Sequence, residues 1–142
     1  MRKRPFMRFN ESTLYPADEP NLKKNGSFPS GHTLLGWSSA LLLSEINPDR
    51  ADTILARGLM YGESRVIVGA HWQSDVDAAR LAAAAAYAKL HTSERFLEQM
   101  RLAREEFRVK TGLATIIEMK AWQKEQKKRA KAAAKAAKAA AR

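Results

Sequence analysis

The feature that most constrains the fold is the stretch of residues 33–46, which is apolar nearly all round a helical wheel. A helix of that composition has to be covered on several sides, so the stretch predicts a buried helix. Pro48 disfavours helical backbone at Asn47 and should end the helix there. No segment shows sustained alternation of apolar and polar residues. The sequence therefore predicts an all-α fold.

Three further helices are expected after this one. Apolar residues at helical spacing favour a helix over residues 49–68, and Ser74 is expected to cap an alanine-rich helix that reaches residue 90. A fourth helix should cover residues 96–107. Residues 1–28 contain several prolines and a glycine and are expected to be loop.

The charge of the chain is concentrated at one end. The net charge is +10, and residues 123–142 supply +7 of it. Residues 113–122 are expected to form a short amphipathic helix, and the Ala- and Lys-rich residues 130–142 a solvated, fraying one. We expect two regions, a folded domain over residues 1–109 and a basic tail over residues 110–142. Because the basicity lies in the tail, nucleic acid is expected as a partner only through it.

Composition excludes several classes of protein. The chain has no cysteine, which excludes a disulfide scaffold, a zinc finger and a cysteine nucleophile. The longest mainly apolar stretch, residues 34–43, is shorter than the roughly 20 residues that a membrane-spanning helix needs. Polar residues follow the basic amino terminus where a signal peptide would be apolar. We therefore expect neither a membrane span nor an export signal.

A candidate anion site begins at the segment FPSGHT, residues 28–33. The first backbone N–H groups of a helix lack partners and, with the helix dipole, favour an anion. Gly31 would let a phosphate approach the backbone closely, Ser30 adds a hydroxyl donor, and His32 would stand beside the anion. An ordinary serine N-cap next to a surface histidine is the alternative interpretation.

The second candidate segment is SRVIVGAHWQSD, residues 64–75. The planar guanidinium of Arg65 suits a tetrahedral oxyanion. Asp75 lies four residues after His71 and could accept its Nδ1 proton, which leaves Nε2 free as a nucleophile. A purely structural His–Asp pair is the alternative. With three histidines and no further acidic cluster, no metal site is expected.

Together the two segments resemble the signature motifs of the type 2 phosphatidic acid phosphatase superfamily. The wider sequence is similar to bacterial class A non-specific acid phosphatases over roughly residues 2–108. The matching stretches are RPF at residues 4–6, NGSFPSGHT at residues 25–33, EINP at residues 45–48, and residues 62–76. The resemblance implies an all-α helical bundle of the kind shared by these phosphatases and the vanadium haloperoxidases.

The resemblance also implies an activity, the hydrolysis of phosphate monoesters at acid pH through a phosphohistidine and without a metal. In that mechanism His71 is the nucleophile, Asp75 orients it, and His32 protonates the leaving oxygen. No cofactor is implied, and phosphate or vanadate would occupy the anion site. The phosphate-binding residues would be Arg4, Ser30, Gly31 and Arg65.

One departure from the family pattern gives further expectations. In the family's first motif a lysine stands seven residues before the arginine. If Arg4 is that arginine, the position of the lysine lies before Met1. We therefore expect the carboxy-terminal portion of such a domain, with its amino-terminal helices missing and with weak activity or none. Apolar surface left uncovered on residues 34–46 and 78–90 predicts a homo-oligomer. The family resemblance implies a periplasmic location.

Two other functions stay open at this point. A vanadium-dependent haloperoxidase would use the same anion pocket, and oxidation of bromide in the presence of vanadate would reveal it. An inactive phosphatase-like fragment could instead bind nucleic acid or membrane lipid through its basic tail. Salt-sensitive DNA binding that is lost on deletion of residues 123–142 would support that function.

Overall fold

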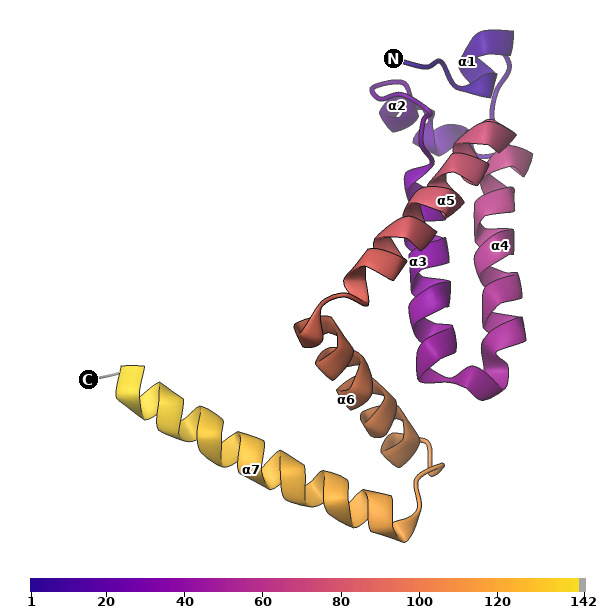
Figure 1. Ribbon diagram of the computed structural model, residues 1–142. Coiled ribbons are helices and arrows are strands. Elements are labelled where there is room, and N and C mark those ends of the chain that lie inside the picture. The colour runs from indigo at the N-terminus through magenta and orange to yellow at the C-terminus, as the bar shows by residue number, and fades with distance from the viewer. Residues whose placement is uncertain (141–142) are drawn as a thin grey trace. The chain divides into compact units, whose positions relative to one another are not determined.

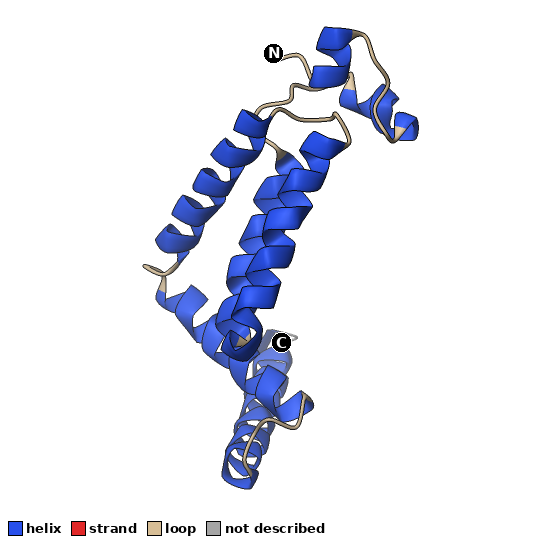
Figure 2. Cartoon of the chain, turned by 90° about the vertical axis from the view of Figure 1, so that its right-hand side faces the viewer, coloured by secondary structure: helices blue, strands red, loops and turns tan. Residues whose placement is uncertain are grey.

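The computed structural model describes residues 1–140, and every regular element in that part of the chain is helical (Figures 1 and 2). The predicted all-α fold is confirmed. None of the helices in residues 1–140 is long and apolar enough to cross a bilayer. The α-helices are α1 (Pro5–Phe9), α2 (Glu19–Leu22), α3 (Gly31–Ile46), α4 (Ala51–Ile67), α5 (Gln73–Leu90), α6 (Glu94–Lys110) and α7 (Ile116–Ala140).

The chain forms two compact units, Met1–Phe96 and the residues from Leu97 onwards. In the first unit α3 and α4 lie side by side and α5 packs against α3 (Figure 1). The short helices α1 and α2 lie at the end of this bundle where α3 and α5 begin and α4 ends. The division into a domain over residues 1–109 and a tail stays a prediction.

Helix α3 starts and ends as the local sequence predicts. The hydroxyl of Ser30, the N-cap residue, accepts a hydrogen bond from the backbone N–H of Thr33 at 3.3 Å. The helix ends before Pro48, which opens a short 3₁₀ turn, Pro48–Arg50. Small residues let α3 and α4 approach closely, since a Cβ added at Gly58 would lie 2.4 Å from the Cβ of Ala40.

Two local expectations are wrong. Residues 1–28 contain α1, α2 and a 3₁₀ turn, and each has a proline in its first turn, where a fixed φ favours helical backbone. Helix α5 begins at Gln73 after Trp72, and Ser74 does not cap it. The carboxylate of Asp75 accepts the Trp72 backbone N–H at 2.9 Å instead.

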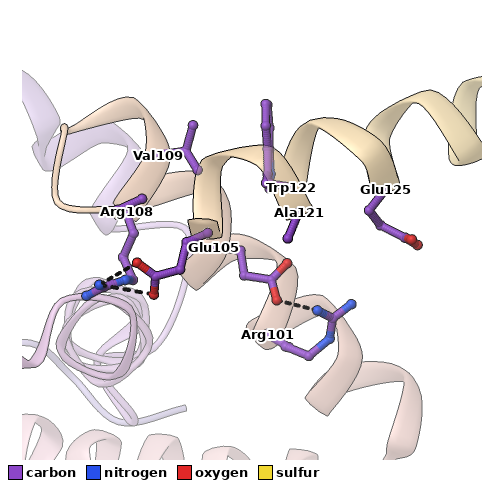
Figure 3. Close-up of a pocket in the computed structure, with 9 residues that line it drawn as sticks. Arg101, Glu105, Arg108, Val109, Ala121, Trp122 and Glu125 are labelled. Atoms are coloured by element: carbon purple, nitrogen blue, oxygen red, sulfur yellow. Dashed lines mark hydrogen bonds and ion pairs between the residues drawn. The ribbon is translucent and has the colours of Figure 1, made fainter. Parts of the chain in front are cut away.

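The second unit contains α6 from Leu97 onwards and α7. Helix α7 is continuous, so the expected separation into a short amphipathic helix and an Ala/Lys helix is wrong. Arg108 pairs with Glu118, and Arg129 pairs with Glu98, so ion pairs connect the two helices. A cavity of about 440 Å³ lies between α6 and α7, beside Trp122 (Figure 3).

The close contact of α3 with α4 gives a prediction about stability. Gly58→Ala should lower the free energy of unfolding by about 1–3 kcal/mol, because the added methyl group overlaps Ala40 in a packed core. Urea denaturation followed by circular dichroism measures the change. Gly31→Ala is the matched control, since a Cβ there meets nothing within 4 Å. Equal stability of Gly58→Ala and the unsubstituted protein would contradict the packing.

Candidate active site

His71 lies in the turn between α4 and α5, and its side chain is only 3% exposed. Gly69 has a φ of +83°, which reverses the chain after α4, and the His71 backbone N–H then donates to the Arg65 carbonyl at 3.1 Å. The Nη1 atom of Arg4 lies 3.0 Å from Nε2 of His71. Because a guanidinium can only donate, Nε2 must be the acceptor, and the proton of the neutral ring is on Nδ1.

Asp75 is fully buried one helical turn after His71, in the first turn of α5. One carboxylate oxygen accepts from Nη1 of Arg2 at 2.7 Å, and the other from the Trp72 backbone N–H. Nδ1 of His71 lies 3.5 Å from that second oxygen. The histidine and the aspartate are therefore neighbours, but with the ring neutral this contact is not an ion pair, and it is too long for a strong hydrogen bond. Nδ1 has no hydrogen-bond partner in the described chain.

The guanidinium of Arg4 connects three segments. It donates to the carbonyl oxygens of Leu22, Gly26 and Ala70 and, at 2.6 Å, to Oδ1 of Asn25. The side chain is buried as a result. These bonds fix the amino-terminal segment against the loop before α3 and against the turn that carries His71.

The start of α3 lies against the start of α5. Ser30 is fully buried, and its backbone N–H donates to the Asp75 carbonyl at 3.1 Å. The space in front of Gly31 is open, since a Cβ added there would meet nothing within 4 Å. His32 is exposed on the next residue, with its ring centroid 6.3 Å from that of Tyr61.

The guanidinium of Arg65 has one buried donor that nothing in the described chain accepts. Its Nε atom is buried and has no hydrogen-bond partner within residues 1–140. Partial burial of the ring lowers the pKa of His32, and the positive charge of Arg65 lowers it further. Burial and the charge of Arg4 lower the pKa of His71 in the same way. A buried donor without an acceptor, beside a second arginine, favours binding of an anion.

The third histidine, His91, is not part of this group. Its two ring nitrogens face the Tyr87 carbonyl at 2.9 Å and a carboxylate oxygen of Glu45 at 3.0 Å. Both neighbours are acceptors, which favours the doubly protonated ring, so the pKa of His91 is raised. In residues 1–140, His, Asp and Glu side chains form no group of three that could hold a metal ion.

Sequence reasoning missed Arg2. Its guanidinium donates to Asp75 and also to the Ser74 hydroxyl at 2.9 Å, across more than seventy residues of chain. A signal was present, since Arg2 stands two residues before Arg4, and alternate residues of an extended segment point to the same side. The other predicted site residues all belong to segments that meet at this end of the bundle.

Comparisons with known proteins agree with this architecture. Residues 1–96 match the family model described as PAP2 superfamily. The chain belongs to the PAP2 superfamily.

Among curated proteins, the chain is 55% identical over 107 residues to a non-specific acid phosphatase of Providencia stuartii, which covers 75% of this chain and 43% of that protein. It is 52% identical over 113 residues to a non-specific acid phosphatase of Salmonella typhimurium, covering 80% of this chain and 45% of the relative. It is 48% identical over 105 residues to an acid phosphatase of Zymomonas mobilis, and the matched region covers 74% of this chain and 40% of that protein. The chain thus spans less than half the length of these relatives.

The electrostatics of the site predict the order in which the histidines titrate. In a two-dimensional NMR titration, His91 should keep its second proton to higher pH than His32 or His71. Arg65→Gln should raise the pKa of His32, because it removes a repelling positive charge, whereas Lys89→Gln should leave that pKa unchanged. An unchanged or lower His32 pKa in Arg65→Gln would show that Arg65 does not act on this histidine.

Proposed function

We propose that this site binds a phosphoryl group and hydrolyses phosphate monoesters through a phosphohistidine on His71, without a metal. One observation carries the proposal most directly. The buried, unpaired Nε of Arg65 lies in the same site as Arg4, whose Nη1 touches the unprotonated Nε2 of the buried His71. The names of the curated relatives, all acid phosphatases, support the same reaction.

The proposed first step is attack of the His71 Nε2 lone pair on phosphorus. The bond from phosphorus to the alcohol oxygen breaks, its electron pair goes to that oxygen, and protonated His32 supplies the proton. The phosphorylated ring keeps its Nδ1 proton and is positively charged. The buried carboxylate of Asp75, 3.5 Å from Nδ1, stabilises that charge.

The second step reverses the proton transfer. Neutral His32 removes a proton from water as the water oxygen attacks phosphorus. The phosphorus–nitrogen bond breaks, its electron pair returns to Nε2, and inorganic phosphate leaves. Donors that are fixed before the reaction stabilise the charge on the phosphoryl oxygens in both steps. We assign this role to Arg4, Arg65, Ser30 and the backbone N–H of Gly31.

Arg4 has a specific part in this proposal. While its Nη1 donates to Nε2 of His71, the lone pair that must attack phosphorus is engaged. A phosphoryl oxygen is a stronger acceptor than an imidazole nitrogen because it is charged. Substrate binding would therefore draw Nη1 from Nε2 to the phosphate and release the nucleophile at the moment it is needed.

The pH dependence follows from the two histidines. His71 has to be neutral, and its pKa is lowered by burial and by Arg4, so it becomes protonated only at acid pH. His32 has to be protonated, and a bound phosphate dianion should raise its pKa towards or above the ordinary value of about 6.5. Activity then requires a pH between these two values, which predicts a bell-shaped profile centred below neutrality.

Substitution of the histidines tests the mechanism. His71→Ala should abolish hydrolysis of p-nitrophenyl phosphate, because the proposed intermediate forms on His71. His32→Ala should slow alkyl phosphates more than p-nitrophenyl phosphate, whose leaving group needs no proton. EDTA should have no effect and vanadate should inhibit. His91→Ala, which lies outside the site, is the control and should keep the profile of the unsubstituted protein.

Either of two outcomes would contradict the mechanism. Hydrolysis that persists in His71→Ala would exclude this nucleophile, and hydrolysis that EDTA removes would indicate a metal. Bromide oxidation in the presence of vanadate, with no phosphatase activity, would favour the haloperoxidase alternative.

We further propose a periplasmic location and a homo-oligomer. The periplasmic location rests on the similarity to bacterial acid phosphatases. The oligomer rests on apolar side chains in the first unit that nothing in the described chain covers. Leu35 of α3 is 64% exposed and Leu81 of α5 is 73% exposed.

Light scattering measures the oligomeric state. The unsubstituted protein should have a mass above that of one chain at concentrations well above micromolar. Leu35→Gln combined with Leu81→Gln should shift it towards the monomer, because apolar contact area is lost. An unsubstituted protein that stays monomeric would contradict the proposal.

A further inference from the structure

Helix α7 has seven lysines on one side. They lie between Lys120 and Lys138, at successive steps of four, three, one, three, four and three residues. At 3.6 residues per turn these positions fall within an arc of about 100°, and at 1.5 Å per residue they extend for about 27 Å. All seven side chains are exposed. We call this set the lysine stripe.

The acidic residues of α7 are on its other side. Glu118 pairs with Arg108 of α6, and Glu125 pairs with Arg129, which also reaches Glu98 of α6. No lysine of the stripe forms an ion pair with another residue of the described chain. Like charges three or four residues apart destabilise a helix. The stripe therefore lowers the stability of α7 unless an external anion neutralises it.

Two exposed isoleucines stand at the start of the lysine stripe. Ile116 is 67% exposed and Ile117 is 81% exposed, both in the first turn of α7. Ile117 lies three residues before Lys120 and seven before Lys124, so it projects from the same side of the helix. A large apolar side chain gains about 1.5–3 kcal/mol when it is fully removed from water. This face of α7 thus combines an apolar end with a long cationic surface.

We propose that this face of α7 binds the surface of an anionic phospholipid bilayer. The lysine stripe contacts the phosphate groups of the lipids, and the two isoleucines enter the boundary between headgroups and acyl chains. Basic helices of this kind bind peripherally, parallel to the membrane. The surface belongs to the second unit alone and does not depend on the proposed phosphatase activity.

The shape of the stripe favours a bilayer over a nucleic acid. A straight stripe within an arc of about 100° can touch a flat surface along its whole length. A helix in the major groove of a duplex has phosphates on both sides, which calls for basic residues over a wider arc. Single strands bind on aromatic side chains, and the stripe contains none. The isoleucines have no role on a phosphate backbone but a clear one on lipid.

The test measures cosedimentation of the full chain with vesicles of phosphatidylcholine, with and without phosphatidylglycerol. We expect binding to the mixed vesicles, weakening with salt, and no binding to phosphatidylcholine alone. Lys124→Gln with Lys131→Gln should weaken binding about 30-fold, because each lysine near an anionic surface contributes about fivefold. Lys24→Gln with Lys89→Gln removes the same charge outside the stripe and should change binding less than about twofold.

A second double variant separates the lipid from a duplex. Ile116→Ser with Ile117→Ser should weaken vesicle binding about tenfold, with the helix content checked by circular dichroism. Equal losses from the two lysine pairs would overturn the proposal, since binding would then depend on net charge alone. Equal binding to both kinds of vesicle would also overturn it. The proposal would also be overturned if the isoleucine variant bound vesicles normally and duplex DNA displaced the protein from vesicles.

Discussion

The end of the bundle that carries the candidate site depends on one buried residue, Asp75. Its side chain accepts from Arg2 and from the Trp72 backbone and lies beside His71, while its carbonyl accepts from the Ser30 backbone. One residue thereby holds the amino-terminal segment, the start of α3 and the turn before α5 together. Because Asp75 is fully buried, loss of Arg2 would leave its carboxylate without a charged partner, so Arg2 is as much a part of the site as the aspartate. The contacts of Asp75 thus both position His71 and hold this end of the bundle together.

The second constraint is an excess of positive charge. Arg4 and Arg65 repel each other, and burial together with that repulsion lowers the pKa of Arg4. The protein holds these two cations beside an open helix start although nothing in the described chain neutralises Arg65. A bound phosphate would supply the absent acceptor, raise the pKa of His32 and release the nucleophile from Arg4. Substrate binding and activation are then consequences of one electrostatic imbalance.

The sequence predicted those features of the fold and site that depend on residues close to one another along the chain. The start of α3 was predictable because a serine cap, a glycine and an apolar run stand next to one another. The proximity of His71 and Asp75 was predictable because only three residues separate them where the turn enters α5. The bond from Arg2 to Asp75 was not, because the spacing of Arg2 and Arg4 indicates a shared side of the chain but no local pattern identifies a partner 73 positions away. The sequence predicted two helices where the structure has α7, because the amphipathic part and the Ala/Lys-rich part differ in composition. Helix propensity is high across both parts, which explains the single continuous helix.

The site of phosphorylation tests the central claim most directly. After rapid quenching during turnover of a phosphate monoester, tryptic digestion separates residues 66–80, which contain His71, from residues 25–50, which contain His32. Mass spectrometry then locates the phosphoryl group, and lability to acid distinguishes a histidine from a serine adduct. The account predicts an acid-labile phosphoryl group on residues 66–80 that disappears in His71→Ala. A phosphoryl group on residues 25–50, or hydrolysis without any phosphorylated peptide, would contradict it.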